Sequence, residues 1–344
     1  MLYESEFYCP DCDNGLDVPT FGSHRQTRRE FLGTAVVGAA SAGLLVTPAS
    51  AARRAARPAE ALIRELHASL SDDQKKKLVL PRDHKRRDGK LSRLGTYNSA
   101  ILGKRLDTHL TSAQQELVQR TVFSLLSGDD AWERITRYGK WDNSGSFERT
   151  GCAFFGEPGD DQKYSWVFSG HHLTFRCDGN TEPDTAFGGP IYYGHSVNGY
   201  NKRNVYLYQT RQVQAVWDAL DPAQRKIATA ARNPGDREQG IKFPKPGTAV
   251  PGIAYQALQA DQQKLVASVM RTLLSPFRQE DAREVMQIVE ANGGMKQIHL
   301  AFYKDRRSTD DQVRWNYWRL EGPGFIWNYR VLPHVHCYVN IINS

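Results

Sequence analysis

Two stretches of the chain alternate large apolar residues with polar ones on both sides of a glycine. The first spans residues 166–175 and contains Gly170, and the second spans residues 318–327 and contains Gly322. A period of two is the pattern of a strand with one buried face, and a glycine within it marks a tight turn. Each stretch therefore predicts an antiparallel hairpin.

Two other stretches, residues 110–127 and 258–275, carry the helical period, because apolar residues recur on one stripe of a helix. In the first stretch the stripe is Leu117, Val118, Thr121, Val122 and Leu125, and in the second it is Leu265, Val266, Val269, Met270 and Leu273. A shorter pair of matching segments, residues 70–75 and 220–225, precedes them. These segments predict capped amphipathic helices.

The matching segments recur in the same order at offsets of 148 to 152 residues, which is the size of a domain rather than of a solenoid repeat. We therefore expect an α+β fold built from an internally duplicated unit, with helices followed by an antiparallel β-meander in each copy. The predicted halves are residues 62–200 and 210–344, with residues 198–204 as the crossover loop. They are expected to form one compact body around a pseudo-twofold axis.

The N-terminal region has the features of an export signal. Residues 27–33, Thr-Arg-Arg-Glu-Phe-Leu-Gly, form a twin-arginine motif, and residues 31–52 carry no charge. The small residues Ala49, Ser50 and Ala51 predict cleavage after Ala51, so residues 1–51 are expected to be removed and the mature protein to be periplasmic or secreted, without a stable membrane span. A retained membrane anchor is the alternative. Because the twin-arginine route carries folded proteins, it favours a protein that acquires a metal or cofactor before export.

Composition excludes several classes of protein. With 40% hydrophobic, 24% charged and 10% aromatic residues, the chain has the composition of a packed globular protein, and a mean hydropathy of -0.58 excludes a polytopic membrane protein. Removal of residues 1–51, with three Arg and six acidic residues, would raise the net charge from +7 to +10. The basic run at residues 75–93 suits an acidic surface or polysaccharide, but no nucleic-acid-binding motif accompanies it, so no nucleic-acid partner is expected.

Three cysteines remain in the predicted mature chain, since Cys9 and Cys12 precede the cleavage site. In an oxidising compartment Cys152, Cys177 and Cys337 permit one disulfide, and we expect it between Cys152 and Cys177.

Two groups of histidines are the candidate metal ligands. His334 and His336 are two apart on an expected strand and would share a face, whereas His171 and His172 are adjacent at the expected turn after Gly170. Neither half contains both groups, which predicts an asymmetric site where the halves meet. A polar strand face without a metal is the alternative interpretation of the His334 and His336 pair.

Four imidazoles predict a divalent transition metal, with copper or zinc first and iron or manganese next. Glu157, which follows an apolar segment and precedes a proline, is the expected carboxylate, as a ligand or a general base, with a solvated loop acid as the alternative. No P-loop, G-x-G-x-x-G, G-x-S-x-G or H-E-x-x-H motif occurs.

Several segments together resemble the family known as domain of unknown function 3500, over about residues 60 to 344. The resemblance rests on residues 154–158 (Phe-Phe-Gly-Glu-Pro), 166–173 (ending Gly-His-His-Leu), 322–325 and 334–336. The chain departs from the family pattern after His336, where Cys-Tyr-Val-Asn stands in place of a Trp-Arg segment. The resemblance implies no particular reaction, but it groups the four histidines and Glu157 into one constellation.

We therefore expect an exported protein with a histidine-rich metal site that acts on a small-molecule or polymeric ligand. One possibility is a metal-dependent oxidoreductase or hydrolase. The alternative is a non-catalytic periplasmic metal-binding or carbohydrate-binding protein, and a structural or adhesive role is the third. An open coordination position would favour catalysis, and a closed four-ligand site would favour binding.

Overall fold

The computed structural model describes residues 59–159, 162–182, 184–231, 234–243, 248–304 and 315–342. The expected signal region, with Cys9 and Cys12, lies outside these residues. The segment from Ala59 to Ser344 forms one compact unit. Within the described ranges, no helix has the length and apolar character needed to cross a bilayer.

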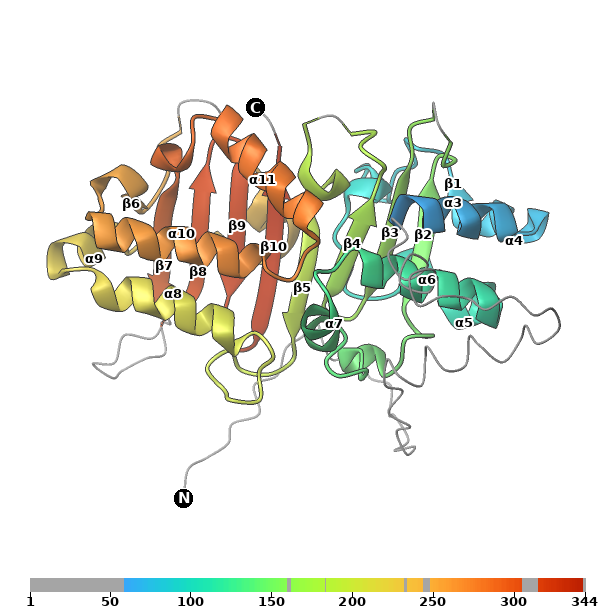
Figure 1. Cartoon of the computed structure of the whole chain (residues 1–344), viewed down its shortest axis with the longest axis horizontal. Helices are drawn as coiled ribbons and strands as arrows, with labels where there is room; N and C mark the ends of the chain where they lie inside the picture. Colours follow the sequence, from blue (N-terminus) through green and yellow to red (C-terminus); the bar gives the residue numbers. More distant parts are fainter. Residues whose placement is uncertain are drawn as a thin grey trace, which may run out of the picture. The chain divides into compact units, whose positions relative to one another are not determined.

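A ten-stranded sheet crosses the unit in the order β1-β2-β3-β4-β5-β10-β9-β8-β7-β6 (Figure 1). The strands are β1 (Val79–Leu80), β2 (Gly151–Phe155), β3 (Ser165–Gly170), β4 (Leu173–Cys177), β5 (Ile191–His195), β6 (Ile253–Ala254), β7 (His299–Lys304), β8 (Trp315–Gly322), β9 (Phe325–Arg330) and β10 (Val335–Ile341). All neighbours are antiparallel except β1 and β2. Strands β5 and β10 pair in the middle, so the two halves of the chain share one sheet.

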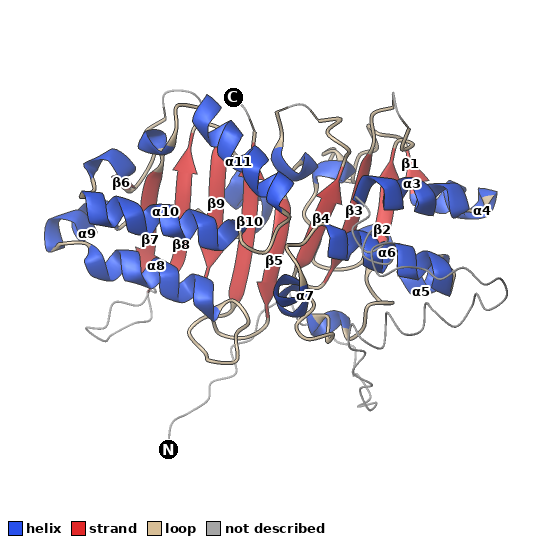
Figure 2. Cartoon of the chain, in the orientation of Figure 1, coloured by secondary structure: helices blue, strands red, loops and turns tan. Residues whose placement is uncertain are grey.

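Helices cover one face of the sheet, as Figure 2 shows. They are α3 (Ala59–Ser69), α4 (Asp72–Leu78), α5 (Leu106–His109), α6 (Ser112–Ser124), α7 (Asp129–Ile135), α8 (Leu207–Ala219), α9 (Pro222–Ala228), α10 (Ala260–Leu274) and α11 (Gln279–Ala291). Between this layer and the sheet lies the main core, which contains large buried aromatic side chains such as Trp166, Trp318 and Trp327. Burial of this apolar surface is the main source of stability.

Irregular segments cover the other face. Ile101 packs with Phe155 and Val167 over the first half, and Ile241 packs with Ile326 and Tyr338 near the centre. The polar residues of the strands that face this side are therefore buried under loops rather than exposed to water.

The predicted helices and hairpins are confirmed. In α6 and α10 the predicted stripe is buried, with Leu117 and Leu265 at its half-buried edge. Capping boxes begin α4, α6, α9 and α10. Within each half, the glutamines of the two capping boxes form a hydrogen bond with each other. Gln74 Nε2 donates to Gln114 Oε1 (2.7 Å), and Gln224 Nε2 donates to Gln262 Oε1 (2.8 Å).

The α+β class is confirmed by the helix layer and the mostly antiparallel sheet. The strand order reads outward from the centre as β5 to β1 on one side and as β10 to β6 on the other. The internal duplication and its pseudo-twofold axis stay a prediction. A duplicated unit would show this strand order and one such glutamine pair in each half.

The expected disulfide between Cys152 and Cys177 is wrong. Both residues are buried free thiols. Cys152 lies on β2 and pairs with Phe168, whereas Cys177 lies on β4 and pairs with Trp166, so β3 separates the two sulfurs. Two strand spacings of about 4.8 Å exceed the Cα separation of about 7 Å beyond which a disulfide cannot form.

Candidate metal centre

The turn between β3 and β4 consists of His171 and His172. His172 has a φ of 53°, in the left-handed region that costs a residue other than glycine on the order of 1 kcal/mol. Its backbone N–H donates to Asn98 Oδ1 (2.8 Å), and its carbonyl accepts a hydrogen bond from Arg137 Nη2 (2.7 Å). These two hydrogen bonds hold the backbone in this conformation and fix the position of the His172 imidazole.

The second half supplies His334 and His336, next to and within β10. His336 pairs across the sheet with Gly194 of β5. A Cβ at position 194 would overlap the carbonyl oxygen of Val335 and lie 3.3 Å from Cβ of His172. The missing side chain at Gly194 therefore lets His172 approach the two histidines of the other half.

The Nε2 atoms of these three histidines converge. The distances are 3.2 Å from His172 to His334, 2.8 Å from His334 to His336 and 2.9 Å from His336 to His172. Two nitrogens that each lie about 2.0–2.1 Å from one tetrahedral ion are separated by roughly 3.3 Å. The three side chains are at most 5% exposed. Two of the three observed distances are clearly shorter than this separation, so the rings would move slightly apart around an ion. The three buried imidazoles form a group that can hold one.

Two carboxylates fix the orientation of two of the rings. His172 Nδ1 lies 2.9 Å from Asp142 Oδ2, and His336 Nδ1 lies 2.8 Å from Asp236 Oδ2. An ionised carboxylate only accepts hydrogen bonds, so both Nδ1 atoms carry the proton and both Nε2 atoms present a lone pair. Such a carboxylate behind a ligating histidine is a common second shell of metal sites.

The third histidine accepts a hydrogen bond from an arginine. Arg330 Nη2 lies 2.9 Å from His334 Nε2, and a guanidinium only donates, so His334 Nε2 is an acceptor. The single in-plane lone pair of His334 Nε2 therefore accepts the Arg330 N–H. A metal ion bound at this nitrogen would replace that hydrogen bond and displace the Arg330 guanidinium.

The three imidazoles are uncharged near neutral pH. Burial lowers the pKa of His172 and His336 well below the usual value, and Arg330 also lowers the pKa of His336. Burial and the Arg330 charge lower the pKa of His334 to about 3. The imidazoles are consequently neutral near pH 7, which is the form that binds metals.

Charges around the centre are balanced. Burial alone would raise the pKa of Asp142, but the contacts with His171 and His172, together with the nearby Arg137, lower it well below the usual range. Asp236 pairs with Arg330. Two carboxylates and two guanidinium groups thus surround three neutral imidazoles.

The segment that carries Asp236 is anchored to the first half. Glu238 Oε2 accepts a hydrogen bond from Arg86 Nη2 (2.8 Å), and the backbone N–H of Thr96 donates to Glu238 Oε1 (3.0 Å). Arg86 belongs to the basic run at residues 75–93, so part of that run has a structural role next to the site.

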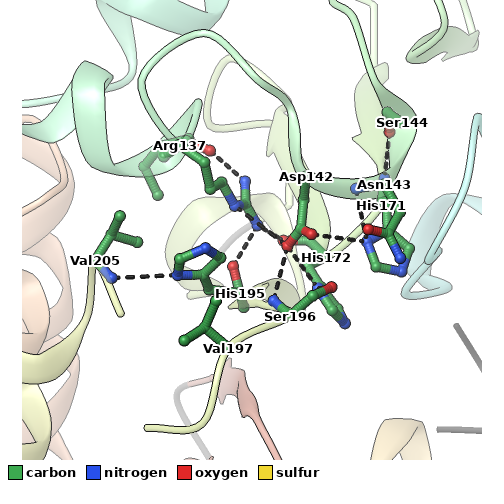
Figure 3. Close-up of polar contacts among 12 residues, drawn as sticks. Arg137, Asp142, Asn143, Ser144, His171, His172, His195, Ser196, Val197 and Val205 are labelled. Atoms are coloured by element: carbon green, nitrogen blue, oxygen red, sulfur yellow. Dashed lines mark hydrogen bonds and ion pairs between the residues drawn. The ribbon is translucent and has the colours of Figure 1, made fainter. Parts of the chain in front are cut away.

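His171 lies beside the three converging histidines. Its ring centroid is 3.9 Å from that of His172, and its Nδ1 lies 3.6 Å from Asp142 Oδ1 (Figure 3). Its Nε2 is buried and has no hydrogen-bond partner. His171 joins Asp142 and His172 in a second group of possible ligand atoms on the Nδ1 side of His172.

Glu157 does not join the histidines. Strand β2 is antiparallel to β3, with Gly151 opposite Ser169 and Phe155 opposite Ser165. Glu157, two residues beyond β2, therefore lies at the end of the strands remote from the β3–β4 turn, and it is exposed. The carboxylates at the centre are Asp142 and Asp236.

Neither aspartate was predicted from the sequence. Asp142 is 30 positions from His172, and Asp236 is 100 positions from His336. Both lie in turn-like segments, Asp-Asn-Ser-Gly and Pro-Gly-Asp, which carry no periodicity that could relate them to the histidines. The only local signal was that each segment is a polar loop.

The sequence profile of the family described as "Protein of unknown function (DUF3500)" matches residues 52–340. The chain therefore belongs to this family, as the resemblance indicated. No curated protein and no solved structure matches the chain.

Proposed function

We propose that His172, His334 and His336 bind one divalent transition-metal ion through Nε2, and that the protein is a metal-dependent enzyme. The observation that supports the metal site is the convergence of three Nε2 atoms within 2.8–3.2 Å of one another. Imidazole ligands suit zinc and copper better than manganese, and the two carboxylates behind the rings favour zinc first and copper second.

Catalysis is favoured over simple storage because three protein ligands leave a fourth position open on a tetrahedral ion. Since the surrounding carboxylates and guanidinium groups balance, a divalent ion would add net positive charge. That charge favours hydroxide or an anionic group at the open position. When bound, a zinc ion would supply an activated water for hydrolysis, and a copper ion would supply redox chemistry.

In this proposal His171 stays outside the coordination sphere, with its ring packed against His172. Its Nδ1 accepts a hydrogen bond from the backbone N–H of Asn143 (3.4 Å), so the ring proton is on the buried Nε2, which has no partner. His171 can therefore donate a hydrogen bond to a group at the open position.

The alternative is a non-catalytic metal-binding protein, in which His171 rearranges to close the fourth position. The burial of the site and the 9% exposure of His171 favour this second possibility. Cobalt(II)-loaded protein distinguishes the two. Azide should change the visible spectrum of an open site and leave that of a closed site unchanged.

The metal site itself is tested by measuring metal content after purification and by titrating chelator-treated full-length protein with zinc, copper, iron and manganese. The test variant carries His334→Ala and His336→Ala. The matched control carries His109→Ala and His299→Ala, which remove two histidines away from the centre. Binding near one ion per chain that is lost only in the test variant supports the proposal. Equal binding by both variants, or no binding by the wild type, refutes it.

Export is proposed from the twin-arginine motif in residues 27–33. N-terminal sequencing of the protein from the periplasm or medium should show cleavage after Ala51. Changing Arg28 and Arg29 together to Lys should retain the full-length chain inside the cell.

A further inference from the structure

We propose that a basic cavity between α7 and α8 binds a small molecule with two or more carboxylate or phosphate groups. The cavity has a volume of about 460 Å³, and its lining includes Arg134, Tyr138, Lys202, Arg203, Tyr208 and Arg211. It is distinct from the candidate metal centre, and the proposal does not depend on a bound metal.

Charge is the main argument. The cavity is lined by four cationic side chains and by no acidic one. Among the described residues, none of Arg134, Lys202, Arg203 and Arg211 forms an ion pair with a carboxylate. Four cations held around one concave surface repel one another and create a positive potential within it, and a multivalent anion relieves both effects.

The geometry suits oxyanion groups. Arg134 Nη1 donates to the carbonyl oxygen of Val205 (3.3 Å), and its guanidinium carbon lies 4.5 Å from the centroid of the Tyr208 ring. These contacts restrain Arg134 while leaving other N–H groups available, and the planar guanidinium binds carboxylate and phosphate in a bidentate manner.

Helix α8 adds to the same potential. It has 13 residues, and Asn204 accepts hydrogen bonds from the N–H groups of Tyr206 (2.8 Å, at Oδ1) and Leu207 (3.1 Å, at the carbonyl oxygen). No acidic side chain lies in its first turn, so the positive end of the helix dipole keeps its sign at the cavity, which Leu207 and Tyr208 line.

The shape of the cavity favours a small molecule over a polymer. A volume of about 460 Å³ lies within the range of about 300–1,000 Å³ that is typical of small-molecule sites. At the cavity, Tyr138 is 59% exposed and has a φ of 57°. It offers an aromatic surface to the organic part of a ligand beside the cations.

A hydrogen-bonded layer separates the cavity from the metal centre. The N–H of Val205 donates to His195 Nδ1 (3.2 Å), and the N–H of the next residue after His195, Ser196, donates to Asp142 Oδ2 (3.0 Å) (Figure 3). None of His172, His334 and His336 lines the cavity. Anion binding can be measured with the metal removed.

The test is isothermal titration calorimetry of chelator-treated full-length protein with citrate, tripolyphosphate and inorganic phosphate. The test variant carries Arg203→Gln and Arg211→Gln, two exposed positions. The control carries Lys85→Gln and Arg87→Gln, which lower the net charge equally at exposed positions away from the cavity. Citrate identifies carboxylate preference, and tripolyphosphate identifies phosphate preference.

We expect citrate or tripolyphosphate to bind to the wild type and to the control with similar affinity, and to the test variant at least about tenfold more weakly, since the variant loses two charge-assisted hydrogen bonds to the ligand. Binding should also weaken with added salt. Absence of binding to the wild type, or equal weakening in both variants, would overturn the proposal. Binding of long polyanions such as heparin alone would also overturn it.

Discussion

The turns of two hairpins in this protein occupy equivalent places but differ in sequence and role. The β3–β4 turn joins Gly170 to Leu173 through His171 and His172, and the β8–β9 turn joins Gly322 to Phe325 through Pro323 and Gly324. The last turn residue has a positive φ in both cases, 53° for His172 and 63° for Gly324. Proline followed by glycine is the ordinary local solution for such a turn, because glycine adopts positive φ without strain.

His172 adopts the positive φ that glycine adopts in the other turn, and its side chain and backbone both make contacts that glycine could not replace in full. Its imidazole reaches the other half of the sheet and meets His334 and His336, and its backbone is held by Asn98 and Arg137. Residues that break a local rule while the surroundings hold them in place are concentrated at functional sites. The β8–β9 turn serves as an internal reference for a turn without such a site.

The largest expected effect comes from making the first turn resemble the second. His172→Gly should lower metal affinity by at least about 100-fold, because it removes a ligand, while the chain stays folded, because glycine relieves the strain at positive φ. His171→Ala should lower affinity less than tenfold if His171 is not a ligand. Competition with a chromophoric chelator measures both affinities, and circular dichroism verifies folding. Unchanged affinity in His172→Gly would remove this turn from the metal site.

The converse change places a side chain at the glycine of the β8–β9 turn, Gly324. A Cβ there would overlap the carbonyl oxygen of Ile342, so Gly324→Ala should lower the free energy of unfolding by about 2–3 kcal/mol without changing metal affinity. Gly89 also has positive φ, but nothing lies within 4 Å of a Cβ there. Gly89→Ala should therefore cost only about 1 kcal/mol. Urea denaturation measures both, and equal losses would show that the overlap is relieved.

The carboxylate that holds the His172 ring predicts an intermediate effect on metal affinity. Asp142→Asn removes the carboxylate that orients His172 and should lower metal affinity by about 10- to 100-fold. Asp261→Asn, which changes an exposed carboxylate at the start of α10, is the matched control and should have no effect on metal affinity. If Asp142→Asn retains full affinity, the orientation of His172 is set by the turn backbone alone.

The last prediction is a pH dependence of stability to which the buried histidines of the site contribute. Because the pKa of His334 falls to about 3 in the folded protein, the unfolded chain binds more protons below its ordinary value near 6.5. The stability of metal-free protein should be greatest above pH 6.5 and decrease as the pH falls, by up to about 1.4 kcal/mol per pH unit for each such histidine.

Urea denaturation between pH 4.5 and pH 8 measures this dependence. The double variant His334→Ala and His336→Ala should have a smaller slope below pH 6.5. A slope equal to that of the wild type would show that other groups cause the acid sensitivity.

The sequence by itself determined the elements of this fold. Helical stripes, capping residues and alternating strands depend on neighbours within a few positions, so α6, α10 and both hairpins were predictable. Alternation on β10 also placed His336 and Cys337 on opposite faces, as observed, with Cys337 in the main core. The expectation that the halves contribute different histidines to one place agrees with the observed convergence, because a two-residue spacing fixes which side chains share a face.

Only the tertiary structure decided which groups complete the site. Strand order separated Cys152 from Cys177 by β3 and placed Glu157 at the far end of the strands. Asp142 and Asp236 reach the histidines through loops, whose paths depend on contacts between distant segments rather than on a local period. The left-handed conformation of His172 is likewise held by Asn98 and by Arg137, because its own sequence does not favour it.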